Sequence, residues 1–115
     1  FRLRLVMTWK KVCSLNALEK GQIVELVVDG VRVVVVRGEN HVAVIPPLCP
    51  HLEEPLRDGI CDGRTLTCHK HLWQWELKSG NPLGEARKAL KHYMSKVEGG
   101  QVIAFIEREI LYDYD

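Results

Sequence analysis

Cysteine and histidine are concentrated in one short segment of this 115-residue chain. The segment from Cys49 to His71, CPHLEEPLRDGICDGRTLTCHKH, holds three of the four cysteines and three of the five histidines. Thiolate sulfur and imidazole nitrogen are strong protein ligands for soft and borderline metals. This concentration predicts a metal centre, and the fold must then bring the two ends of the segment together.

Two residue pairs mark the ends of this segment. One residue separates Cys49 from His51, two separate Cys68 from His71, and sixteen lie between the pairs. Each pair falls in a loop-like stretch, and Pro50 stiffens the first loop, which lowers the conformational entropy lost when a site forms. One thiolate and one imidazole from each of two loops make a set of four ligands.

Three interpretations of this set compete. Free thiols and surface histidines would suit isolated residues, but two ordered pairs on either side of a hairpin disfavour that interpretation. A structural zinc site accepts two cysteines and two histidines, although zinc fingers usually place two of a kind close together. A two-iron cluster holds two cysteines on one iron and two histidines on the other, which suits one of each per loop. This third interpretation is favoured.

Turn signals and β-branched runs predict strands along most of the chain. Asp29-Gly30 separates two β-branched runs, which is typical of a hairpin, and Asp62-Gly63 predicts a second one. Pro46-Pro47 interrupts pairing because proline has no N–H to donate. A helix is expected only at residues 85–90, EARKAL. The predicted strands are 23–28, 31–36, 41–45, 60–67 with its central turn, 73–77, 93–97 and 102–106. They indicate one mostly β domain, a sandwich or barrel of short antiparallel strands.

Composition and charge disfavour several classes of partner. Sixteen Lys and Arg against fifteen Asp and Glu leave a net charge of +1, without the basic excess that nucleic-acid binding requires. The longest apolar run, Val33-Val34-Val35-Val36, is too short to span a bilayer. Met7 is interpreted as a possible start, with residues 1–6 as an extension and no secretory signal. We therefore expect a cytoplasmic protein with reduced thiols and no membrane partner.

The spacing Cys-x-His-x₁₆-Cys-x₂-His resembles the signature of Rieske proteins. The resemblance implies one [2Fe–2S] cluster per chain, with Cys49 and Cys68 on one iron and His51 and His71 on the other. It also implies an all-β Rieske fold, an antiparallel β-sandwich with a small cluster-binding subdomain of two loops. Residues 1–115 then form a single Rieske domain, with the cluster-binding subdomain at about 46–83 and a tail at 107–115.

Two departures from high-potential Rieske proteins predict a low reduction potential. Those proteins carry an extra cysteine in each cluster loop, where this chain has Glu54 and Lys70, so no disulfide is expected across the site. They also have a hydroxyl-bearing residue that donates to a cluster sulfide, where this chain has Leu72 and Trp73. Fewer donors stabilise the reduced state less. We expect a potential nearer about −150 mV than about +300 mV, the ends of the Rieske range.

The segments CPHLEEPL, HLW and GNPLGEA resemble Rieske ferredoxins of bacterial multicomponent monooxygenases of the toluene-monooxygenase type. The resemblance implies an electron carrier and not an enzyme. Its partners would be an NADH-dependent flavin reductase, as electron donor, and the terminal hydroxylase of an aromatic or alkene monooxygenase. Two alternatives stay open: a ferredoxin of a ring-hydroxylating dioxygenase, and a zinc-stabilised interaction module.

Other cysteines and histidines are expected to be structural. His69 lies next to the ligand pair, but the family places its ligand at the third residue after the cysteine, so His69 is expected at the surface. Cys13 and Cys61 are predicted to be packed as small apolar residues. His41 and His92 are isolated in strand-like segments, where a histidine is usually structural.

Three further features of the sequence carry expectations. Trp73 and Trp75 alternate with polar residues, which predicts core packing, and Trp73 is also compatible with shielding the cluster. The tail at 107–115 is expected to be frayed. Acidic residues between the ligand pairs usually solvate a loop, and they could also steer docking to a basic partner. They are Glu53, Glu54, Asp58 and Asp62.

Overall fold

The run Val33-Val34-Val35-Val36 lies at the centre of the fold. In the computed structural model, which describes residues 9–70 and 72–114, all four side chains are fully buried. Successive side chains of a strand point to opposite faces, so such a run is buried only where both faces of its sheet are covered. The sheet that contains this run is therefore a middle layer. Residues 1–6, interpreted above as an extension, lie outside the described residues.

Short strands and two 3₁₀ turns make up the regular structure of the described residues. In chain order they are β1 (Trp9–Ser14), η1 (Leu15–Ala17), β2 (Ile23–Val28), β3 (Val31–Arg37), β4 (Val42–Ile45), η2 (Leu56–Asp58), β5 (Ile60–Cys61), β6 (Thr65–Thr67), β7 (Gln74–Glu76), β8 (Pro82–Leu83), β9 (Ser95–Glu98) and β10 (Gln101–Phe105). The predicted all-β class is confirmed, and the strands pair antiparallel in three sheets, β1-β10-β9, β2-β3-β4 and β5-β6-β7-β8.

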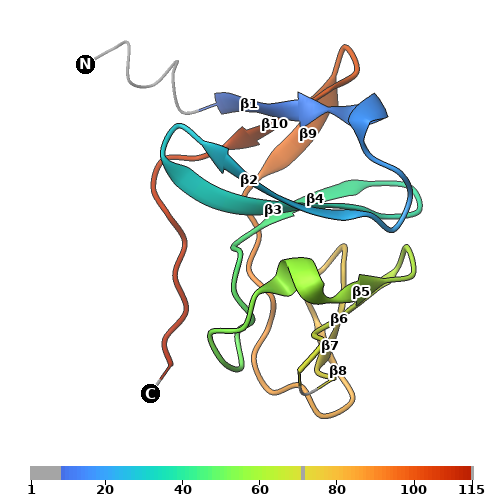
Figure 1. Ribbon diagram of the computed structural model, residues 1–115, viewed down its shortest axis with the longest axis vertical. Coiled ribbons are helices and arrows are strands. Elements are labelled where there is room, and N and C mark those ends of the chain that lie inside the picture. Colours follow the sequence, from blue (N-terminus) through green and yellow to red (C-terminus); the bar gives the residue numbers. More distant parts are fainter. Residues whose placement is uncertain (1–8, 71, 115) are drawn as a thin grey trace.

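The β2-β3-β4 sheet lies between the other two sheets (Figure 1), and its two faces pack into two separate hydrophobic cores. On one face, Val33 and Val35 pack with residues of β10, including Val102. On the other face, Val34 and Val36 pack with the β5-β6-β7-β8 sheet, where Trp75 is the largest fully buried side chain. The second core is continuous with the two loops that follow β4 and β6, so it forms the floor of the candidate site.

The Asp-Gly hairpin between β2 and β3 forms as predicted. Asp29 has φ 51° and Gly30 has φ 84°, the left-handed values that a tight hairpin turn of the I′ type needs at both central residues. The six-residue register from Ile23↔Val36 to Val28↔Val31 follows directly from this turn. The other predicted hairpins also form, with strand ends shifted by one or two residues.

The helix expected at residues 85–90 is not formed; the structure has turns and irregular chain there. Backbone groups of this stretch bond to distant partners instead. The N–H of Leu90 donates to the carbonyl of Gly80 at 2.9 Å, and the carbonyl of Lys88 accepts from the indole of Trp75 at 2.8 Å. Packing has overridden a local helix propensity, which is a weak preference over six residues.

The C-terminal tail, residues 107–114 as described, is held and not frayed. Tyr93 accepts a hydrogen bond from the N–H of Ile110, and the hydroxyl of Tyr112 accepts one from Lys91. The expectation of a frayed tail is therefore wrong for these residues. In the described residues no helix is long and apolar enough to cross a membrane.

Candidate metal centre

The first candidate loop connects β4 to η2 and carries Cys49 and His51. Pro46 and Pro47 end the pairing of β4, and an isolated bridge between Leu48 and Pro55 then closes the loop. The N–H of Cys49 donates to the carbonyl of Glu54 at 2.8 Å across its base. The base of the loop is thus fixed, with Cys49 at the base and His51 beyond it in the loop.

The second candidate loop joins β6 to β7 and begins with Cys68. The N–H of Cys68 donates to the carbonyl of Trp73 at 2.8 Å, and the N–H of Leu72 donates back to Cys68 at 3.1 Å. Leu72 has φ 58°, a conformation that costs an L-residue about 1–2 kcal/mol. The strained turn next to the position of His71 is typical of a site whose geometry is imposed by its surroundings.

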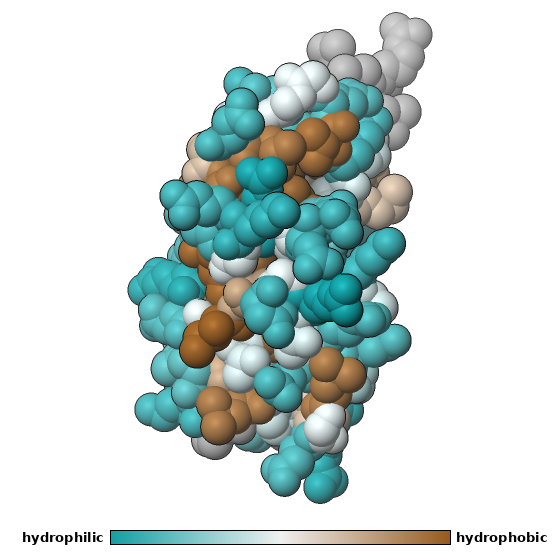
Figure 2. Space-filling model, turned by 90° about the vertical axis from the view of Figure 1, so that its right-hand side faces the viewer, coloured by the Kyte–Doolittle hydropathy of each residue, from teal (hydrophilic) through white to brown (hydrophobic). Residues whose placement is uncertain are grey.

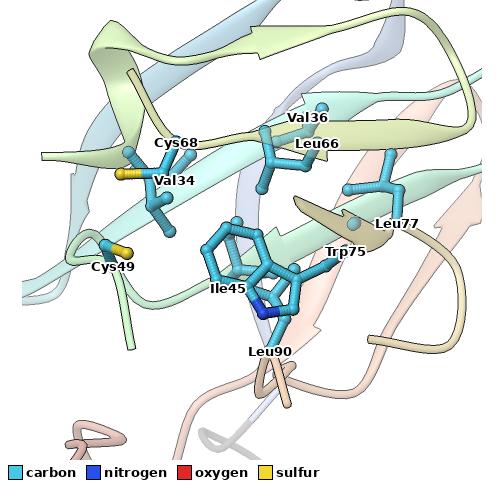
Figure 3. Packing of buried hydrophobic residues seen from close by; sticks show 11 residues of the cluster. Val34, Val36, Ile45, Cys49, Leu66, Cys68, Trp75, Leu77 and Leu90 are labelled. Atoms are coloured by element: carbon cyan, nitrogen blue, oxygen red, sulfur yellow. The ribbon is translucent and has the colours of Figure 1, made fainter. Parts of the chain in front are cut away.

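The structure brings the two cysteines together. Cys49 and Cys68 are each 1% exposed and belong to the same buried group as Trp75. Figure 3 shows their sulfur atoms at one edge of this group, approaching from separate segments of the chain. Burial raises the pKa of Cys49 to about 11, the neighbouring Cys68 thiol adds to the rise, and the backbone N–H groups of His51 and Leu52 oppose it.

This pair of thiols fits a metal better than it fits a purely structural role. Two adjacent sulfur atoms are buried beside backbone donors, and the N–H of His51 points at the sulfur of Cys49 at 3.4 Å. The raised pKa means that a metal ion must displace protons to bind, as thiolate ligands require. All four cysteines are free, so among the described residues no disulfide competes for these sulfur atoms.

His51 lies stacked against an aromatic ring. The rings of His51 and Trp73 are 4.1 Å apart between centroids, with planes 10° from parallel. The stack fixes the plane of the imidazole, and it joins the first loop to the second. Sequence analysis predicted core packing for Trp73, compatible with shielding of the cluster. The structure leaves Trp73 partly buried against the core and stacks its ring on a predicted ligand.

The remaining predicted ligand, His71, lies outside the described residues. In the part of the chain that the structure describes, no three Cys, His, Asp or Glu side chains gather as a complete metal site. The four-ligand set therefore stays a prediction. His69, the competing candidate, is exposed, and its imidazole lies 3.9 Å from the carboxylate of Glu54.

The other cysteines and histidines lie away from this centre. Cys13 is partly buried with the core beside β10, and Cys61 is partly buried beside the Asp62 turn, as predicted. The imidazole of His92 bonds to the carbonyl of Leu77 at 2.6 Å, a structural contact. Burial lowers the pKa of His41, and the nearby charges of Lys78 and His92 lower it further, so this imidazole is favoured in its neutral form.

Comparison with known proteins decides the family. The sequence profile of the Rieske [2Fe–2S] domain family matches residues 8–94. The chain belongs to this family. Its cofactor is thus a Rieske-type [2Fe–2S] cluster, and a zinc-stabilised module is ruled out as the family assignment.

Relatives of this Rieske protein include ferredoxin components of several oxygenase systems. It is 40% identical to the methanesulfonate monooxygenase ferredoxin subunit of Methylosulfonomonas methylovora over 95% of this chain and 89% of the relative. It is 29% identical to the ferredoxin component of the alkene monooxygenase system of Xanthobacter autotrophicus, over 80% and 76% respectively.

Solved structures share the fold. The ferredoxin of carbazole 1,9a-dioxygenase from Nocardioides aromaticivorans IC177 superposes with a TM-score of 0.75 at 27% identity, over 84% of this chain and 96% of that one. A second match, at TM-score 0.78 and 23% identity, covers 90% of this chain and 98% of a chain in a complex of oxygenase and ferredoxin. At that identity the second match supports the fold alone.

One residue of the site was missed by sequence analysis. The hydroxyl of Tyr114 donates to the carbonyl oxygen of Cys49 at 2.7 Å. Burial raises the pKa of Tyr114 to about 12, with smaller contributions from Cys49 and Glu53, so the hydroxyl remains a donor at neutral pH. No local signal could have found this contact, because 65 residues separate the two partners.

Proposed function

We propose that this chain is the electron-carrying ferredoxin of a multicomponent oxygenase. In this proposal Cys49 and Cys68 hold one iron of the cluster, while His51 and His71 hold the other. When bound, the cluster accepts and releases one electron at a time. The whole chain acts as one Rieske domain, with residues 46–83 as its cluster-binding part.

The convergence of two buried thiols on separate loops carries this proposal. A free structural cysteine needs no partner, whereas these two share one buried edge with a stacked imidazole beside them. Buried apolar side chains beneath the thiols exclude water, which keeps a cluster from hydrolysis and tunes its potential. The relatives named as ferredoxins of oxygenase systems support the carrier role.

The partners follow from that role. The electron donor is an NADH-dependent flavin reductase, and the acceptor is the terminal oxygenase of a monooxygenase system. The relatives named for methanesulfonate and alkene monooxygenases favour a monooxygenase. From the sequence, the partner oxygenase was expected to act on an aromatic or alkene substrate. The relative named for methanesulfonate monooxygenase makes an alkanesulfonate a second candidate substrate of that oxygenase. A dioxygenase system is the second candidate, favoured by the likeness to the carbazole dioxygenase ferredoxin.

The ligand set is tested by substitution and spectroscopy. We expect the purified protein to be reddish-brown, with a Rieske EPR signal after reduction. Cys68→Ser and His71→Ala should lose or change that signal. Cys61→Ser and His69→Asn are matched controls, because they remove the same kinds of side chain a few residues away and should keep it. A native signal in His71→Ala would exclude His71 as a ligand.

The partner assignment is tested by kinetics with purified candidates. The reduced protein should transfer its electron to the cognate oxygenase in stopped-flow mixing, and a dioxygenase from another system should accept it far more slowly. Increasing ionic strength should slow the transfer if the acidic loop steers docking. Equal rates with unrelated oxygenases would contradict a dedicated monooxygenase partner.

A further inference from the structure

The C-terminal tail, residues 107–114, returns to the loop that carries Cys49. Figure 1 shows it leaving the β1-β10-β9 sheet and running along one side of the molecule to the level of the cluster-binding part. Its end is fixed there because the hydroxyl of Tyr114 donates to the carbonyl of Cys49 at 2.7 Å. The tail therefore contacts the backbone of a proposed ligand directly.

Contacts along the tail determine where Tyr114 lies. The N–H of Ile110 donates to the hydroxyl of Tyr93 at 2.9 Å, and the N–H of Lys91 donates to the hydroxyl of Tyr112 at 2.8 Å. The amino group of Lys91 also donates to the carbonyl of Leu111 at 3.0 Å. These contacts hold the tail against residues 88–93 in a single register. They therefore restrict Tyr114 to a position next to Cys49.

Residues 88–93 are in turn anchored to the core under the site. The indole of Trp75 donates to the carbonyl of Lys88 at 2.8 Å, while the amino group of Lys88 donates to the carbonyl of Asp113. That amino group also lies 5.8 Å from the ring centre of Tyr114. A continuous series of contacts thus runs from Trp75 through residues 88–93 and the tail to the loop that carries Cys49.

We propose that Tyr114 is a positioning residue of the cluster site, whose hydroxyl holds the peptide carbonyl of Cys49 and so orients that thiolate. The inference rests on the proposed function, in which Cys49 is an iron ligand. The Tyr114 hydroxyl restricts the motion of the first loop at Cys49, the proposed ligand. Its positive end also points toward the site, which stabilises the more negative, reduced state.

Tyr114→Phe in the full-length, cluster-loaded protein tests this role. Phenylalanine keeps the ring and its packing, so circular dichroism should be unchanged. The midpoint potential should fall, and the EPR g-values should shift. Loss of cluster absorbance on warming should become about fivefold faster, the effect of one net hydrogen bond.

Tyr112→Phe is the matched control. It removes the same hydroxyl two residues earlier, where the partner is the exposed Lys91 and not the cluster loop. The tail keeps its register in this variant, because Ile110, Leu111 and Asp113 retain their own hydrogen bonds. Its potential and EPR signal should equal those of the wild type. Unchanged potential and cluster loss in Tyr114→Phe, or equal changes in both variants, would overturn the positioning role while leaving the ferredoxin intact. A wild-type protein without a Rieske signal would instead refute the proposed function itself.

Discussion

Trp73 joins the two cluster loops through two different parts of the residue. Its ring stacks on the imidazole of His51 at 4.1 Å, and its carbonyl accepts from the N–H of Cys68 at 2.8 Å. The side chain therefore orders the first loop, while the backbone closes the second. Displacement of one loop is transmitted to the other because both contacts belong to a single residue.

Replacing Trp73 should change the reduction potential. Trp73→Ala uncovers His51 and admits water, which stabilises the more negative, reduced state. The midpoint potential, measured by voltammetry, should rise by at most about 20–60 mV, the shift if the whole energy of an aromatic pair, about 0.5–1.5 kcal/mol, differed between the two redox states. Trp9→Ala is the control, because that ring packs on Phe105 in another sheet. A potential that stays the same or falls in Trp73→Ala would contradict this role.

Gly80 is predicted to tolerate no side chain. It has φ 80°, and an added Cβ would clash with the carbonyl of Leu90. The contact is with backbone, so it is not relieved by a rotamer change. Gly80→Ala should destabilise the fold by about 2–4 kcal/mol in denaturant unfolding, since strain and a clash combine.

Gly84 provides the matched comparison for Gly80. It also has a positive φ, 59°, but an added Cβ would meet nothing within 4 Å. Gly84→Ala should therefore cost only the conformational term, about 1–2 kcal/mol. Equal losses in the two variants would mean that the approach of Leu90 to Gly80 is unimportant.

Cys13 and Cys61 are predicted to react slowly with alkylating agents at neutral pH. Burial raises the pKa of both thiols, and for Cys61 the N–H of Gly63 opposes the rise. The thiolate is the nucleophile, so a raised pKa lowers the reactive fraction below its usual value. Alkylation by iodoacetamide should be slower than that of free cysteine at pH 7 and should accelerate above pH 9.

Mass spectrometry of the cluster-loaded protein measures this reactivity by site. Cys13→Ser and Cys61→Ser identify each signal and should leave the cluster intact. Rapid alkylation of either thiol at pH 7, with the cluster retained, would show that burial does not suppress its ionisation.

The sequence was sufficient where the determining signals are local. The Asp29-Gly30 turn and the β-branched runs beside it specify the hairpin and its register. The four-valine run was predicted as part of a strand, but the sequence analysis predicted neither its burial on both faces nor the sheets that cover it. The two Cys/His pairs could be proposed as ligands from short spacing alone, because each pair spans only three or four residues of the sequence.

Long-range contacts explain what the sequence did not show. The tail was expected to be frayed because terminal residues are usually poorly ordered, yet its hydrogen bonds go to residues 49, 88, 91 and 93. The stretch at 85–90 looked helical because its local propensity is favourable, but Trp75 and Gly80 engage its backbone. Both errors arise where tertiary contacts outweigh local preferences.

The surface gives a separate lesson about docking. Figure 2 shows apolar patches scattered among hydrophilic residues on the face in view, and not one continuous apolar area. Leu52 and Leu72 lie in the two cluster loops and are 44% and 69% exposed. Asp62, one of the acidic residues considered above for steering a partner, accepts hydrogen bonds from the N–H groups of Arg64 and Thr65. Its carboxylate therefore stabilises the turn between β5 and β6.

Glu25 links the middle sheet to the cluster-binding part of the chain. It lies on β2 and pairs with Arg32 at 3.1 Å and with Arg57 of η2 at 3.3 Å. The Glu25 side chain is only 14% exposed, so these pairs are screened less than fully exposed ones. Glu25→Gln should lower stability by about 0.5–1 kcal/mol, or roughly 2–5 °C in melting temperature at low salt.

Salt dependence separates this electrostatic effect from a packing effect. At about 1 M salt the Debye length falls to roughly 3 Å, so the difference between Glu25→Gln and wild type should shrink by about half. Glu39→Gln is the control, because its 3.4 Å pair with Arg64 is more exposed on both sides. That variant should melt within about 1 °C of wild type. A loss in Glu25→Gln that persists in high salt would assign the effect to packing of the side chain and not to its charge.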